Sequence, residues 1–231
     1  MSVQALRDRL AMLGQISLAR GAHPADDPHM CAMEAVAWLS GEARTDGPQC
    51  ASPVLRAYVI RLNDDWDAEQ RQKLKPYLPR ILNTAGDGLD ETRSFLAADW
   101  LIRTYTSAWL DLAGLPKEAA ALRDHRRIVD MVALASIEPH YSAAYSAAYS
   151  AARSAAGSAA GSAARSAAGS AAGSAAGSAA GSAAYSAARS AAGSAAYSAA
   201  YSAARSALAP TVTILQDSAL DLLDRMIAPT P

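Results

Sequence analysis

Apolar residues recur every three or four positions through most of the first 140 residues, and no run alternates apolar and polar residues long enough to form a strand. This spacing places apolar side chains on one face of an α-helix. The pattern therefore predicts an all-α protein with a helical head domain over residues 1–140. Helices are expected over residues 2–19, 28–40, 53–62, 67–83, 90–113 and 116–137, and over 211–228 near the carboxyl end.

Some helix ends carry recognisable sequence signals. Ser52 precedes Pro53, and a serine cap followed by proline at the first helical position is typical of a helix start. Pro76 and Pro79 have no amide donor, and each ring clashes with the preceding turn. The helix that contains them is therefore expected to kink or split near Lys75.

The strongest helical pattern opens at Asp90 and closes at Gly114. Its broad apolar face predicts the spine of the core. A second apolar face lies on the C-terminal amphipathic helix, within residues 209–231, and needs an apolar partner. We expect that helix to pack on the head domain, which would anchor both ends of the intervening segment together.

That intervening segment, residues 141–208, repeats the tetrapeptide X-Ser-Ala-Ala seventeen times, with Gly, Tyr or Arg at X. Abundant alanine and the absence of β-branched residues favour a helix over a silk-like sheet. Side chains that are small on every face allow close approach between helix backbones. A helical hairpin or several short packed helices is expected ahead of one long rod, and the repeat is expected to serve helix packing, self-assembly or partner binding.

The larger residues of the repeat are the candidate partner-binding residues. Tyrosines and arginines four positions apart lie near each other on a helix, where a guanidinium can lie on a ring. The simpler interpretation is that they keep a helix soluble and stapled. The candidates are Tyr141, Tyr145, Tyr149, Arg153, Tyr185, Arg189, Tyr197, Tyr201 and Arg205.

Charge and composition narrow the partners. The net charge is -1, and four arginines across the whole repeat release few counterions, so nucleic acid is not expected as a partner. Residues 166–188 carry no charge, but serine and glycine make their transfer into a membrane unfavourable, so no membrane association is expected. Two cysteines make no disulfide framework, and the amino terminus lacks the apolar stretch of a secretory signal. These features predict a cytoplasmic protein.

One stretch groups residues with chemical potential: His23, Asp26, Asp27 and His29, followed by Cys31, Glu34, Asp46 and Cys50. We expect two buried thiols beside capping acids, and no metal site. The alternatives are zinc bound by His29, Cys31, Cys50 and an acid such as Glu34, at a spacing that matches no standard finger, or a Cys31 nucleophile beside His29 and Glu34. Phosphate-loop, dinucleotide and zincin motifs are missing, so neither a cofactor nor a small-molecule substrate is expected.

Several stretches resemble a group of proteins encoded by bacteria and their phages. The resemblance covers most of the chain and implies a shared architecture, but it carries no established activity. In that group Trp or Glu often occupies X, where this chain has Gly, Tyr and Arg. The stretches are CAMEAVAWLSGEARTDGPQCASPVLRAYVIRLND (31–64), QKLKPYLPRIL (72–82), AADWLIRTYTSAWLDLAGL (97–115), the alanine-rich repeat, and ILQDSALDLLDRMI (214–227).

The functional hypothesis is a non-catalytic structural or interaction protein whose Ala-Ser repeat mediates close helix packing, self-assembly or binding of a protein partner. The first alternative is a small enzyme or metal protein that uses the region of His29, Cys31, Glu34 and Cys50. The second alternative is an immunity-like protein that binds a cognate toxin, since alanine-rich helical repeats resemble those of some immunity proteins. They also resemble fish ice-binding helices, but the regular threonine ladder of those helices is missing here.

Overall fold

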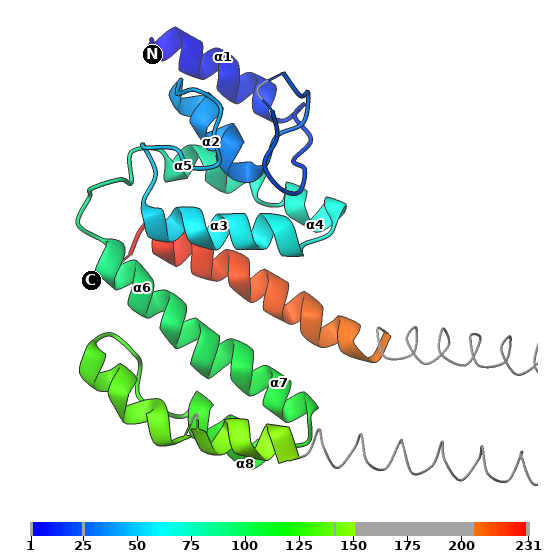
Figure 1. Cartoon of the computed structure of the whole chain (residues 1–231), viewed down its shortest axis with the longest axis vertical. Coiled ribbons are helices and arrows are strands. Elements are labelled where there is room, and N and C mark those ends of the chain that lie inside the picture. The colour runs from blue at the N-terminus through cyan, green and yellow to red at the C-terminus, as the bar shows by residue number, and fades with distance from the viewer. Residues whose placement is uncertain (1, 25, 141, 151–205, 230–231) are drawn as a thin grey trace, which may run out of the picture. The chain divides into compact units, whose positions relative to one another are not determined.

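The computed structural model describes residues 2–24, 26–140, 142–150 and 206–229, and over these residues it confirms the all-α prediction. The described residues contain no strand, and their one isolated bridge joins Leu18 to Met30. None of the described helices is long and apolar enough to cross a membrane. Figure 1 labels α1 (Val3–Leu13), α2 (Ala32–Ser40), α3 (Pro53–Asp65), α4 (Ala68–Gln72), α5 (Leu78–Ile81), α6 (Asp90–Asp99), α7 (Ser107–Leu112) and α8 (Pro116–Arg123).

The described chain divides into two compact units. Of the described residues, unit 1 contains 2–24, 26–101, 126–135 and 217–229. Unit 2 contains 102–125, 136–140, 142–150 and 206–216. Described α-helical residues without a label in Figure 1 are 131–140, 142–150 and 206–227.

Helix α1 is shorter than predicted. Its first turn is capped by Ser2, whose Oγ accepts a hydrogen bond from the Ala5 amide at 3.1 Å. It ends at Leu13, because the following residues turn to pair with the chain before α2: the Ala19 amide donates to the Met30 carbonyl at 3.0 Å. The prediction of a helix over 2–19 was therefore too long at its end.

The same pairing shortens α2 at its start. Met30 is held by the bridge to Leu18, so the helix begins at Ala32 and not at residue 28. Its end at Ser40 is as predicted, with Gly41 in the left-handed conformation at φ 87°. Seven of the nine residues of α2 are buried, which makes this helix the centre of the core of unit 1.

Two of the predicted helix signals are confirmed. Helix α3 begins with Pro53, and the Oγ of Ser52 accepts hydrogen bonds from the amides of Val54 and Leu55. The helix runs three residues beyond the predicted end, to Asp65. The predicted break near Lys75 appears as a 3-10 turn, Lys75–Tyr77, between α4 and α5.

The C-terminal helix contributes to the core of unit 1. Its residues Ala219, Leu222, Leu223 and Met226 are buried in the same cluster as residues of α2, α3 and α5. Figure 1 shows this end of the chain, in red, beside α3. The core also includes Met33, Val36 and Leu39 of α2, Leu55, Val59 and Leu62 of α3, and Leu78 and Ile81 of α5.

Arg93 of α6 binds the end of the C-terminal helix within unit 1. It is fully buried, and its Nε donates to the Met226 carbonyl at 2.9 Å. Its two Nη atoms donate to Asp87 at 2.7 and 2.5 Å, and Nη1 also donates to Asp90 at 3.2 Å. The apolar pattern of the sequence gave no indication of this buried charge.

The predicted helix from Asp90 to Gly114 is helical throughout but not uniform. Between α6 and α7 lies a π-helix, Trp100–Thr106. Leu101 and Leu112 are 51% and 44% exposed. The prediction that this helix forms the spine of the core is therefore wrong for the side of the helix that carries these two residues. The predicted end is confirmed, since Gly114 is left-handed at φ 75°.

The helix predicted over 116–137 is two helices. Helix α8, in unit 2, ends at Arg123, where the Arg123 carbonyl accepts from Arg103 Nε and Nη2 at 3.2 and 3.0 Å. In unit 1, the Ile128 amide donates to Asp99 at 2.8 Å and Ile128 is 1% exposed. Helix resumes at residue 131, with Asp130 accepting from the Ala133 amide at 2.6 Å. Burial of Ile128 and the Asp130 cap explain the break.

Candidate functional site

Cys31 and Glu34 lie together at the start of α2, where they cap the helix. The Glu34 amide donates to Cys31 Sγ at 3.4 Å, and the Cys31 amide donates to Glu34 Oε2 at 2.7 Å. This reciprocal arrangement is a capping box, with a thiol in the place that serine or threonine usually occupies. The expected capping acid is thus identified as Glu34.

The Glu34 carboxylate also holds the loop that precedes α2. Its Oε1 accepts from the His23 amide at 2.6 Å, and its Oε2 lies 3.0 Å from His23 Nδ1. Burial opposes ionisation of Glu34, but the donors from His23 and Cys31 outweigh it and lower the pKa of the carboxyl. Glu34 is therefore a charged anchor within the fold.

Neither thiol has the environment of a nucleophile. Cys31 is buried, and this burial is the main cause that raises its pKa to about 12. Cys50 is half-buried, and burial raises its pKa as well. Because the thiolate is the reactive form, this environment does not favour the alternative of a Cys31 nucleophile. Both cysteines are free, as expected, but only Cys31 is fully buried.

The remaining metal candidates point to other partners. His29 Nδ1 lies 2.9 Å from Asp27, and its side chain is 60% exposed. The Cys50 amide donates to Glu42 at 3.0 Å. Within the described ranges no three His, Cys, Asp or Glu residues come close enough together to hold a metal ion.

Arg44 fixes the loop that connects α1 to α2. Its Nη1 donates to the carbonyls of Pro24 and Asp27 at 3.1 and 2.5 Å, and its Nη2 donates to the His29 carbonyl. Hydrogen bonds from a guanidinium to three carbonyls of one loop fix the course of that loop. The charged residues around Cys31 are thus engaged in holding the α1–α2 connection.

A small cavity beside Cys31 does not change this conclusion. Its volume is about 30 Å³, which is room for about one water molecule. A substrate would not fit there. The cavity is lined by Gly21, Ala22, Cys31, Asp46, Ile60, Asn63 and Asp64.

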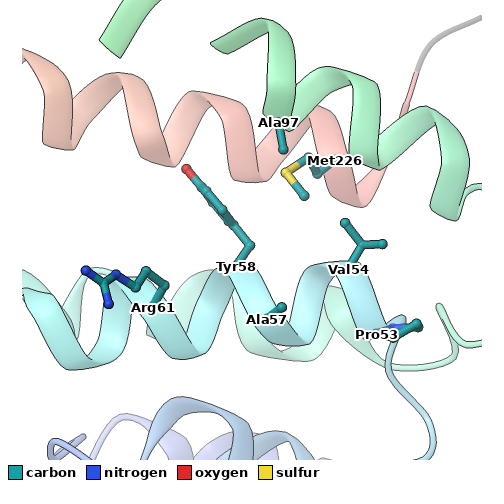
Figure 2. A pocket seen from close by; sticks show the side chains of 7 residues that line it. All are labelled: Pro53, Val54, Ala57, Tyr58, Arg61, Ala97 and Met226. Carbon is teal, nitrogen blue, oxygen red and sulfur yellow. The ribbon is translucent and has the colours of Figure 1, made fainter. Parts of the chain in front are cut away.

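A larger hollow lies on the surface of unit 1, between α3, α6 and the C-terminal helix (Figure 2). It has a volume of about 510 Å³ and is open to solvent. We call it the α3 groove. It is lined by Pro53, Val54, Ala57, Tyr58 and Arg61 of α3, Ala97 of α6 and Met226 of the C-terminal helix.

The wall of the α3 groove is apolar and well fixed. Val54, Ala57 and Tyr58 follow the i, i+3, i+4 spacing of one helix face, and Figure 2 shows Met226 and Ala97 opposite them. The Tyr58 hydroxyl donates to the Ala219 carbonyl at 3.1 Å, and its ring meets Trp100 edge-on at 6.5 Å between centroids. Tyr58 therefore presents its ring to the groove while its polar tip is satisfied.

Arg61 is the charged residue among those that line the α3 groove. The Arg61 side chain is 77% exposed, and its Nε lies 2.6 Å from Asp65. The pKa of the Tyr58 hydroxyl is raised by burial, and the positive charge of Arg225 partly offsets that effect. The α3 groove thus combines apolar side chains with one arginine that is paired with Asp65.

The sequence did not indicate the α3 groove. Val54, Ala57 and Tyr58 were assigned to a helix, but their exposure depends on how α6 and the C-terminal helix meet α3. The only indication of the groove in the sequence is the spacing of small and aromatic residues on α3. Residues of a buried core show the same spacing.

Most of the candidate partner-binding residues of the repeat lie outside the described residues. Two that the structure describes are Tyr145 and Tyr149, which are 67% and 55% exposed. Outside the described residues are Tyr141, Arg153, Tyr185, Arg189, Tyr197, Tyr201 and Arg205.

Comparison with known proteins adds no assignment, because no family model, no curated protein and no solved structure matches the chain.

Proposed function

We propose that this protein is a non-catalytic interaction protein and that the α3 groove is a docking surface for apolar side chains of another polypeptide. The observation that carries the proposal is the groove itself: apolar side chains of three helices line one hollow that is open to solvent. Side chains that contribute most to binding at protein interfaces commonly insert into apolar hollows.

The composition of the groove favours a polypeptide over a small molecule. Small-molecule pockets enclose most of the ligand surface and contain a few converging polar groups, whereas this groove is open and its one polar hydroxyl, on Tyr58, is already bonded. Aromatic residues, methionine and arginine are enriched in protein interfaces. Tyr58 and Arg61 are the residues of those types that reach the surface here.

The side chains near Cys31 are engaged in holding the fold, which supports a binding role over a catalytic one. Glu34 and Arg44 are engaged by loop backbone, and the Cys31 thiol stays protonated at neutral pH. The Ala-Ser repeat remains part of the proposal as a second surface for packing, self-assembly or partner binding, with Tyr145 and Tyr149 exposed at its start.

The test is a selection of displayed helical peptides on the purified full chain, counter-selected with an Ala57→Trp variant. Indole in place of the Ala57 methyl fills the groove. Groove-directed peptides bind the wild type and an Ala11→Trp control, which changes an exposed alanine of α1, and do not bind Ala57→Trp. Recovery only of peptides that bind Ala57→Trp equally well would reject the α3 groove as a docking surface. Melting of each variant confirms that it folds.

A further inference from the structure

Two histidines of the loop before α2 lie close together in unit 1, and each contacts a carboxylate. The ring centres of His23 and His29 are 6.4 Å apart. His23 Nδ1 lies 3.0 Å from Glu34 Oε2, and His29 Nδ1 lies 2.9 Å from Asp27 Oδ1. We infer that His23 and His29 form a binding site for a divalent transition-metal ion, which they hold through their Nε2 atoms.

The carboxylates determine which nitrogen of each ring is available. An ionised carboxylate only accepts hydrogen bonds, so in each neutral ring Nδ1 carries the proton and Nε2 keeps its lone pair. The Nε2 atoms of His23 and His29 make no hydrogen bond to any residue that the structure describes. Histidines that bind metals usually donate their other ring N–H to a carboxylate or carbonyl, which fixes the ring and raises its basicity. Glu34 and Asp27 already provide these partners.

The backbone that carries the two rings is fixed in the same way. Glu34 Oε1 accepts a hydrogen bond from the His23 amide at 2.6 Å, and Asp27 Oδ1 accepts one from the His29 amide at 2.7 Å. Arg44 donates to the His29 carbonyl. The side chains of His23 and His29 are 14% and 60% exposed. An ion from solvent therefore meets two imidazoles whose backbone is already positioned.

The spacing and charge of the pair fit one shared ion after a small movement. Two imidazoles on one tetrahedral zinc ion, with Zn–N bonds of about 2.0–2.1 Å, have ring centres about 5 Å apart. The exposed side chain of His29 can close the remaining distance of about 1 Å. Asp27 and Glu34 together contribute two negative charges, and Arg44 offsets one of them while its Nη atoms are bonded to carbonyls of the loop.

The type of ligand selects the type of metal. Imidazole nitrogens suit Zn²⁺, Cu²⁺ and Ni²⁺, whereas Mg²⁺ and Ca²⁺ prefer oxygen ligands. Within the described ranges no third His, Cys, Asp or Glu residue joins the pair, so water takes the other positions and binding is expected to be weaker than at a structural site with four protein ligands. This pair differs from the zinc site considered from the sequence, because Cys31 and Cys50 take no part.

The experiment is a titration of the full chain, without an affinity tag, with ZnCl₂. Calorimetry measures uptake, and NMR follows the carbon-bound protons of the histidine rings. The wild type is expected to bind one zinc ion, with the ring signals of His23 and His29 shifting together while those of His125 and His140 stay unchanged. MgCl₂ is expected to produce neither uptake nor shifts. No zinc uptake, or uptake without a shift of both His23 and His29, would overturn the inference.

Variants then test the assignment to these residues. His29→Ala is expected to abolish zinc uptake, because one imidazole remains, and circular dichroism checks its fold. Asp27→Asn keeps both rings but weakens the contact that orients His29, so affinity is expected to fall roughly 10-fold. His140→Ala, from a second histidine pair with ring centres 6.0 Å apart in unit 2, is the matched control and is expected to bind as the wild type does. Uptake that survives His29→Ala, or that is lost in His140→Ala or Cys50→Ser, would place the ion elsewhere and overturn the inference.

Discussion

At the scale of single residues, Arg93 places a buried charge in unit 1 that requires hydrogen-bond partners. Its guanidinium is fully buried, yet each of its nitrogens has a partner, and the Asp87 side chain is 26% exposed. A buried charge is tolerated only with such full pairing. The hydrogen bond to the Met226 carbonyl means that this charge also holds the end of the C-terminal helix.

Replacing Arg93 with methionine is expected to lower the free energy of unfolding by about 2–4 kcal/mol. The change removes the hydrogen bonds to Asp87 and the Met226 carbonyl but leaves carboxylates that water can reach, so the loss stays below that of a fully buried pair. Urea unfolding followed by circular dichroism measures it. Arg61→Met, at an exposed pair, is the control and should change stability by less than about 1 kcal/mol. Similar losses for both variants would contradict the role given to Arg93.

Glu34 makes stability depend on pH. Its pKa in the folded protein is lowered by the donors of His23 and Cys31, so its contribution is present above its unfolded pKa and is lost as pH falls through the folded value. We expect Glu34→Gln to cost about 2 kcal/mol near neutral pH, and this cost to shrink as pH falls below about 4. Urea midpoints of both proteins across that range provide the test. A cost that stays constant with pH would contradict an ionised Glu34.

Cys31 is expected to be inert in the folded protein. With its pKa raised to about 12 by burial, its labelling by a thiol reagent at pH near 8 should be at least about 100-fold slower than in urea. Cys50, which is half-buried, should react faster than Cys31, and single Cys→Ser variants assign each rate. Fast labelling of native Cys31 would support the enzyme alternative.

At the scale of elements, the helix ends show which local signals are reliable. Ser52 caps α3 through two amides and also donates to Asp90 at the start of α6. One hydroxyl thus serves the starts of two helices, so its removal affects both.

We expect Ser52→Ala to lower the free energy of unfolding by about 1–2 kcal/mol, the upper part of the range for helix caps, because the hydroxyl is buried. The matched control is Asp67→Ala, an exposed cap of α4 that accepts from the Gln70 amide at 2.8 Å, with an expected cost of about 0.5–1 kcal/mol. Thermal unfolding distinguishes the two. The reverse order would show that the contact with Asp90 adds nothing.

The sequence predicted those elements whose ends depend on local chemistry. The Ser52-Pro53 start, the break near Lys75 and the glycine ends at 41 and 114 are of this kind. The misplaced ends of α1 and α2 depend on the pairing of Leu18 with Met30, which no local pattern encodes. The α3 groove and the buried Arg93 depend on contacts between distant segments, so a search for local motifs passes over them.

At the scale of the whole molecule, unit 1 is closed by segments from both ends of the chain. Leu222 and Leu223 lie in the same core as Met33 and Leu55, although more than half of the sequence separates them. The entropy cost of closing such a loop grows only with the logarithm of its length, about 0.6 kcal/mol for each doubling. A long insertion such as the Ala-Ser repeat therefore costs unit 1 little stability, and its length is free to follow another requirement.

This reasoning predicts the result of replacing residues 151–205 with a Gly/Ser linker of about 20 residues. If the repeat acts on unit 1 only as a connection, the free energy of unfolding of unit 1 should change by less than about 1 kcal/mol. The measurement is urea unfolding followed by the fluorescence of Trp38 and Trp66, which belong to or pack on the core of unit 1, with Trp100 and Trp109 replaced by Phe in both proteins. A loss of several kcal/mol would show that the repeat itself packs on unit 1. An unchanged value, together with loss of self-association or partner binding, would assign the repeat to contacts between molecules.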